Sequence, residues 1–84
     1  MNRKRTVHFF PPARNELRNA VADYNDQCAG LGLELAVEIR RTVARILEFS
    51  SAWTRLSARI RRCLANRFPY AVIFRYTDTH VYIV

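Results

Sequence analysis

The sequence lacks most of the features by which an enzyme or a membrane protein is recognised. Its 84 residues include only two glycines and two cysteines, too few for a glycine-rich phosphate loop or a disulfide framework. No apolar run approaches the roughly 20 residues of a membrane helix. The basic start MNRKRT leads into a segment that two prolines interrupt, unlike a signal peptide. We therefore expect one domain over residues 1–84, cytoplasmic and without membrane association.

Metal ligands and paired carboxylates are also scarce. Cys28 and Cys63 stand 35 positions apart, and His8 and His80 lie near opposite ends of the chain. None of these residues has the close spacing of a zinc site. Asp78 is the only acidic residue in the last 36 positions. We therefore expect no metal and no cofactor.

Arginine is what the chain has in excess. The formal net charge is +7, and thirteen of the fourteen basic residues are arginine. Residues 1–15 carry +4 and residues 49–84 carry +5, whereas residues 16–48 carry −2. A guanidinium group binds phosphate or carboxylate through a planar, bidentate fork. We expect an acidic partner, which is either a nucleic acid or an acidic protein.

The apolar pattern of the first half predicts a strand followed by two helices. Residues 6–10 alternate and are rich in β-forming side chains, and two prolines end the run. Residues 13–28 place their apolar side chains on one helical face, with Pro12 in the first turn, and residues 35–47 repeat this rhythm. Gly30 and the short connection around it predict an antiparallel helical pair.

The second half predicts strands. Residues 55–65 form a candidate strand, Phe68-Pro69 a turn, and residues 70–74 a central strand buried on both faces. Residues 77–79 have turn chemistry, and residues 80–84 form the last strand. The expected fold is α+β in the order β-α-α-β-β-β. An N-terminal strand and an antiparallel helical hairpin precede a three-stranded antiparallel run, and the hairpin covers one sheet face.

The candidate contact residues are a group of arginines in the C-terminal third: Arg59, Arg61, Arg62 and Arg67. They suit phosphates, partner carboxylates, or the protection of an edge strand against unwanted pairing. No catalytic motif is present, and the weak catalytic candidates are Arg61, Arg62, Arg75, Tyr76 and His80. The pattern therefore favours binding over catalysis.

The last strand is the expected docking edge for a partner. Its residues Val81, Tyr82, Ile83 and Val84 carry no charge that would protect an exposed edge. We expect this strand or a neighbour to present unpaired backbone groups. A partner would cover them with an extended strand or with an amphipathic helix in a groove.

The order of these segments resembles the RelE/ParE superfamily of bacterial type II toxins over nearly the whole chain. The residues that carry the resemblance are Val7–Phe10, Ala13, Leu17, Tyr24, Gly30–Gly32, Trp53, Arg61, Arg62 and Arg67–Phe74. The segment Arg67-Phe68-Pro69-Tyr70 looks like the corresponding strand pair of the ParE-like branch. The resemblance implies a RelE/ParE-like fold and a small basic toxin, neutralised by an acidic antitoxin segment that wraps its sheet and helices.

Members of the ParE-like branch poison DNA gyrase, and this is the activity that we expect. The alternative is a ribosome-dependent messenger-RNA endoribonuclease of the RelE-like branch that uses the arginine cluster. That branch has an arginine where this chain has Ala71, and only Arg62 is carried over as a phosphate contact. Family members continue past a strand like residues 81–84, whereas this sequence stops at Val84. A shortened toxin that only binds antitoxin is therefore a further alternative.

Overall fold

The computed structural model describes residues 5–84, so Arg3 and Lys4 of the basic N-terminal run lie outside the described residues. The elements along the chain are β1 (Thr6–Phe9), α1 (Pro11–Gln27), α2 (Leu31–Glu48), β2 (Thr54–Arg55), β3 (Arg61–Leu64), β4 (Ala71–Tyr76) and β5 (His80–Ile83). The α+β class and the helical hairpin are confirmed. None of the helices in the described part of the chain is both long and apolar enough to cross a membrane.

The sheet has five strands in the order β1-β5-β4-β3-β2. Strands β3, β4 and β5 form the expected antiparallel run, but β1 adds to it in parallel beside β5 and β2 adds beyond β3. The expected order β-α-α-β-β-β is therefore wrong by one strand, and the sheet is mixed. A parallel neighbour is possible because the long helical hairpin lies between β1 and β5 in the sequence.

The prediction of a single strand over residues 55–65 is wrong, and this error accounts for the additional strand. The chain turns back within this segment, where the Leu56 and Ser57 N–H groups both donate to the Ile60 carbonyl at 2.8 and 3.2 Å. The Ser57 hydroxyl also accepts from the backbone N–H groups of Arg59 and Ile60. Local serine hydrogen bonds of this kind stabilise a turn against a continuous strand.

The two helices pack through a close approach of their backbones at Gly32. A β-carbon at this position would collide with the Val21 carbonyl and with Asn25, so only glycine fits. The Gly32 N–H also donates to Asn25 Oδ1 at 2.8 Å. Gly30, just before α2, has a φ of 89°, which reverses the chain between the helices and favours glycine.

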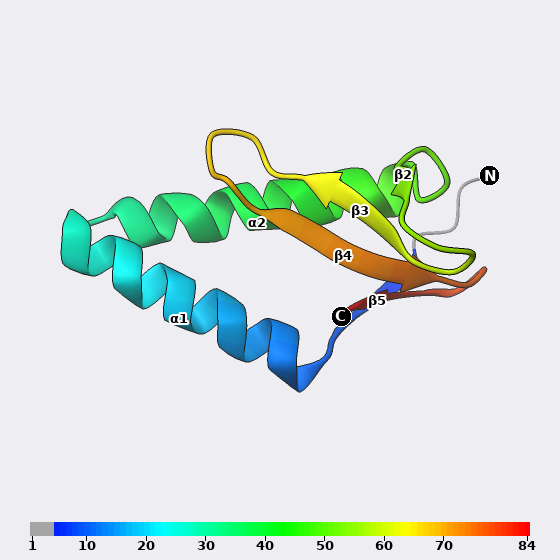
Figure 1. Ribbon diagram of the computed structural model, residues 1–84, viewed down its shortest axis with the longest axis horizontal. Coiled ribbons are helices and arrows are strands. Elements are labelled where there is room, and N and C mark those ends of the chain that lie inside the picture. Colours follow the sequence, from blue (N-terminus) through cyan, green and yellow to red (C-terminus); the bar gives the residue numbers. More distant parts are fainter. Residues whose placement is uncertain (1–4) are drawn as a thin grey trace.

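Helix α2 supplies most of the helical side of the core. Its buried apolar side chains Leu35, Ile39, Val43 and Ile46 belong to the same core as Val72, Phe74, Val81 and Ile83 of the sheet. In α1 only Ala20 is buried, and that helix packs chiefly along α2. Figure 1 shows α2 running behind the sheet, with α1 beside it.

The sheet has one covered face and one open face. Along β4, Val72 and Phe74 are buried, whereas Ala71 and Arg75 are exposed and Ile73 is half-buried. The prediction that residues 70–74 are buried on both faces is therefore wrong. Residues 70–74 are continuously apolar in the sequence because apolar side chains also lie on the exposed face of β4. A continuous apolar run therefore does not prove that both faces of the strand are buried.

The last strand is not an edge of the sheet. β5 lies between β1 and β4, with Val81 opposite Val7 on one side and Tyr76 on the other. The prediction of a free edge at Val81, Tyr82 and Ile83 is therefore wrong, and the Val84 N–H donates to the Ile73 carbonyl at 2.9 Å. The edges are β1, a neighbour of β5, and β2.

Candidate functional site

The open sheet face carries a row of polar and aromatic side chains from four strands. Register and alternation place Arg62 of β3, Arg75 of β4, and His80 and Tyr82 of β5 on this face, together with His8 of β1. Within residues 5–84 the helices leave this face uncovered. These side chains are therefore accessible to a partner.

Two histidines meet at one end of that row. His8 Nε2 and His80 Nδ1 lie 2.8 Å apart and share a hydrogen bond. The His8 ring stacks on Tyr82, with ring centres 5.3 Å apart and planes inclined by 20°. The Arg75 guanidinium lies 4.7 Å from the centre of the Tyr82 ring on the same strand pair. The parallel pairing of β1 with β5 brings the two imidazoles to the Tyr82 phenol, and the antiparallel pairing of β4 with β5 adds the Arg75 cation.

A basic hollow of about 420 Å³ opens at the end of the sheet, where the β2–β3 loop meets the end of β4. We call it the arginine hollow, and it is lined by Arg55, Ala58, Arg59, Arg61, Arg75, Tyr76 and Thr77. Its volume falls in the range of about 300–1,000 Å³ that is usual for small-ligand sites. Four of the seven lining residues are arginines and none is acidic.

Backbone carbonyls hold part of the arginine hollow in place. Arg61 Nη1 donates to the carbonyls of Ser51 and Trp53 at 3.1 and 2.8 Å. The same guanidinium lies 5.7 Å from the centre of the Tyr76 ring, and the Arg5 guanidinium lies 5.0 Å from it. Arg5 also donates to the Thr77 carbonyl. These contacts fix two cations around one phenol before any ligand arrives.

The predicted arginine group is divided between three places. Arg59 and Arg61 line the arginine hollow together with Arg75 and Tyr76, whereas Arg62 lies on the open face beside Ile73. Arg67 lies elsewhere, in the β3–β4 loop, where it forms an ion pair with Glu34 of α2 at 2.7 Å. This hydrogen bond to Glu34 raises the pKa of Arg67.

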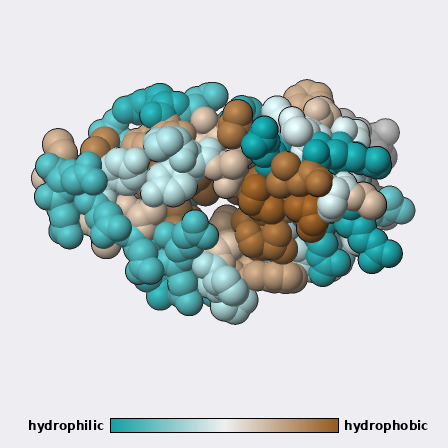
Figure 2. Space-filling view, viewed as in Figure 1, coloured by the Kyte–Doolittle hydropathy of each residue, from teal (hydrophilic) through white to brown (hydrophobic). Residues whose placement is uncertain are grey.

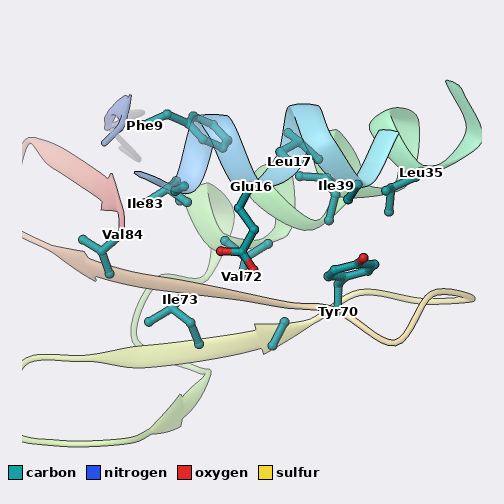
Figure 3. A pocket seen from close by; sticks show the side chains of 13 residues that line it. Phe9, Glu16, Leu17, Leu35, Ile39, Tyr70, Val72, Ile73, Ile83 and Val84 are labelled. Carbon is teal, nitrogen blue, oxygen red and sulfur yellow. The ribbon is translucent and has the colours of Figure 1, made fainter. Parts of the chain in front are cut away.

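The second recess is an apolar groove of about 130 Å³ between α1 and β4. Its lining includes Ala13, Leu17 and Ala20 of α1, Leu35 and Ile39 of α2, Val72 and Ile73 of β4, and Val84. In Figure 2, apolar atoms gather over the sheet beside a hollow that separates them from α1. Figure 3 shows Glu16 reaching from α1 across this groove toward β4.

The first residues of β4 form one wall of the apolar groove and have a strand on one side only. Ala71 and Val72 pair with β3, whereas the pairing of β4 with β5 covers Phe74 to Tyr76. The groove therefore combines an apolar surface with a partly unpaired strand. An extended or helical peptide segment fits both properties.

The sequence did not reveal several residues of these sites, among them His8 and Arg55. His8 was left out because it lies 72 positions from His80, and only the parallel pairing of β1 with β5 joins them. Arg55 ends the short strand β2 rather than starting a long one, and it lines the arginine hollow. The turn-forming Ser57 near it was the one signal that could have revealed the loop.

Two further groups bear on the chemistry of the chain. Burial raises the pKa of the Cys63 thiol, and the positive charge of Arg45 opposes this shift. Among residues 5–84, no three His, Cys, Asp or Glu side chains gather closely enough to hold a metal ion. The reactive groups of the open face are thus imidazole, phenol and guanidinium.

Comparisons with protein-family models, with curated proteins and with solved structures find no match to this chain. The resemblance to the RelE/ParE superfamily therefore stays a prediction from the sequence.

Proposed function

We propose that this protein is the toxin of a bacterial type II toxin–antitoxin pair, and that it arrests growth by binding and poisoning DNA gyrase. The observation that carries the proposal is the separation of two surfaces. An apolar groove lies between α1 and β4, and the arginine hollow lies at the end of the sheet. A toxin needs two such surfaces, one for its antitoxin and one for its target.

The target surface in this proposal is the basic end of the sheet. Arg55, Arg59 and Arg75 have no carboxylate partner among the described residues, whose ion pairs are Arg41–Glu38 and Arg67–Glu34. Unpaired guanidinium groups are suited to binding the acidic surface of a protein–DNA complex. Gyrase bound to DNA offers phosphates and carboxylates together.

The antitoxin surface in this proposal is the apolar groove with the edge strand β1. The groove binds the apolar side of a C-terminal antitoxin segment, while acidic residues of that segment reach Arg62 of the open face. Strand β1 offers four residues without a charged side chain as a template for strand addition. Binding the folded toxin would also raise its melting temperature.

Inducible expression in a bacterium and a supercoiling assay with purified gyrase test the proposal together. We expect growth arrest on induction and loss of gyrase supercoiling as the protein is titrated. Arrested growth with full gyrase activity at saturating protein would contradict gyrase as the target. Undisturbed growth would instead support the alternative of a shortened toxin that only binds antitoxin.

The His8–His80 pair favours a second candidate function, a ribosome-dependent messenger-RNA endoribonuclease. In such a reaction the ribose 2′-oxygen attacks the adjacent phosphorus, and the bond from phosphorus to the 5′-oxygen breaks. One imidazole accepts the 2′-hydroxyl proton and the other donates a proton to the 5′-oxygen. The products are a 2′,3′-cyclic phosphate and a 5′-hydroxyl end. Arg75, on the same face, would stabilise the charge that develops on the phosphate.

Mapping of transcript ends after induction distinguishes the two candidates. The nuclease predicts new ends within translated codons, and it predicts that His8→Ala removes them while the protein stays folded. If wild-type protein produces no new ends, the second candidate fails and the gyrase proposal is unaffected.

A further inference from the structure

The arginine hollow has more positive charge than a single carboxylate can neutralise. Arg55 of β2, Arg59 of the β2–β3 loop and Arg61 of β3 line the hollow together with Arg75 of β4, whose guanidinium lies over the Tyr82 ring of the open face. Arg5 adds a fifth guanidinium on the Tyr76 ring. Like charges gathered around one hollow repel one another, so a ligand of several negative charges is favoured.

The hollow also offers the donors that such a ligand needs. The fold anchors Arg61 to two carbonyls, and these occupy only its Nη1 atom. Arg55 and Arg59 are exposed and form no ion pair within the described chain. Tyr76 and Thr77 line the same hollow. Each guanidinium is a planar fork matched to two oxygens of a phosphate.

We propose that the arginine hollow is a binding site for linked phosphate groups, with pyrophosphate as its smallest suitable ligand. Two linked phosphates carry enough oxygens and negative charge to engage forks from several directions, which an isolated carboxylate does not. The natural source of the phosphates is either a free polyphosphorylated molecule or the backbone of a nucleic acid. The site does not depend on the toxin activity, because its geometry stands without a gyrase or antitoxin partner.

Calorimetric titration of the purified full chain with pyrophosphate and with tripolyphosphate tests the site. We expect saturable binding at constant ionic strength and a melting temperature that rises with ligand concentration. The double variant Arg55→Ala/Arg59→Ala should lose at least tenfold in affinity, since two of the four lining forks are removed. Arg59→Lys should lose part of that affinity, because a point charge replaces a bidentate fork.

Arg40→Ala is the matched control. Arg40 is exposed on α2 and lies outside the lining of the arginine hollow. The Arg40→Ala substitution removes one positive charge from the protein, as Arg59→Ala does. Equal losses of affinity in Arg40→Ala and Arg59→Ala would show diffuse attraction to a basic protein and would overturn the proposal. The absence of saturable binding by either phosphate compound would overturn it as well.

Short single-stranded oligonucleotides distinguish the two sources of phosphate. Nucleic acid as the source predicts oligonucleotide affinity at least tenfold above that of tripolyphosphate, lost again in Arg55→Ala/Arg59→Ala. Each arginine removed should then reduce the salt dependence, the slope of log K against log salt, by about 0.7. Comparable affinities would assign the site to free phosphate compounds. Growth arrest in the absence of any phosphate binding would overturn this inference and leave the proposed function standing.

Discussion

The apolar groove and the arginine hollow are built from different parts of the same small sheet, and they differ in what they can bind. The groove lies between a helix and a strand, and its lining is apolar apart from Glu16 and Tyr70. The hollow lies beyond the helices, and charged or hydroxyl-bearing residues supply all of its lining except Ala58. The apolar groove depends on helix packing, whereas the arginine hollow depends on strand ends and one loop. A substitution can therefore alter one of them without altering the other.

The largest expected effect on the groove comes from Gly32→Ala. The added β-carbon meets backbone of α1 that cannot move aside without separating the helices. We expect a loss of about 3 kcal/mol in the free energy of unfolding, as for severe overpacking, measured by urea denaturation. The phosphate affinity of the protein that remains folded should be unchanged. Gly30→Ala is the control. Its β-carbon enters open space, so we expect the free energy of unfolding to fall by only about 1 kcal/mol, because alanine is disfavoured in the left-handed backbone conformation.

The next largest effect concerns the lining of the groove. Ala13→Asp places a carboxylate in the first turn of α1, where the helix dipole tolerates it. Under the proposed function, binding of the acidic antitoxin should weaken by about 2 kcal/mol, as at an interface hot spot. Surface plasmon resonance measures this, with Ala13→Ser as the uncharged control. If both variants bind like wild type, the antitoxin does not occupy the groove.

A smaller effect is expected on the pH dependence of stability. Burial raises the pKa of the Cys63 thiol above its unfolded value of about 8.5. The unfolded chain therefore releases this proton first, and stability falls as pH rises above about 8.5, by at most about 1.4 kcal/mol per pH unit. Urea denaturation between pH 7.5 and 9.5 should show this slope in wild type. The slope should also persist in the Cys28→Ala variant, because the Cys28 thiol that this change removes is exposed. A slope that persists in Cys63→Ala would assign it to another group.

The smallest effect is expected at Arg67. Its guanidinium pairs with Glu34 on the surface, remote from the lining of the arginine hollow. Arg67→Ala should leave pyrophosphate affinity equal to that of wild type, in contrast to Arg59→Ala. A comparable loss in both variants would return Arg67 to the binding site that the sequence suggested.

The sequence predicted the elements that have a regular apolar period. The helical pair and the strands near residues 6–10 and 80–84 follow from the spacing of apolar residues, because burial on one face imposes that spacing. The strand near residues 70–74 follows from a continuous apolar run. The order of strands does not follow from spacing. No local feature of Thr6–Phe9 indicates its parallel pairing with β5. The prediction that β5 lies at an edge of the sheet was therefore wrong.

The candidate site was predictable to the extent that its residues lie in one segment. Arg59 and Arg61 were found from charge density and do meet in the arginine hollow. Proximity in sequence groups Arg67 with them, but β3 (Arg61–Leu64) separates it from the arginine hollow and it pairs with Glu34 of α2. His8 and His80 could not be joined without the sheet topology.

In the proposed function, the basic end of the sheet binds gyrase and the apolar groove binds the antitoxin. Titration of gyrase supercoiling with wild type, Arg55→Ala/Arg59→Ala and Arg40→Ala tests it most directly. We predict that wild type and Arg40→Ala abolish supercoiling at the same concentration, and that the double variant requires at least tenfold more. Equal inhibition by all three proteins, or no inhibition by any of them, would contradict the account.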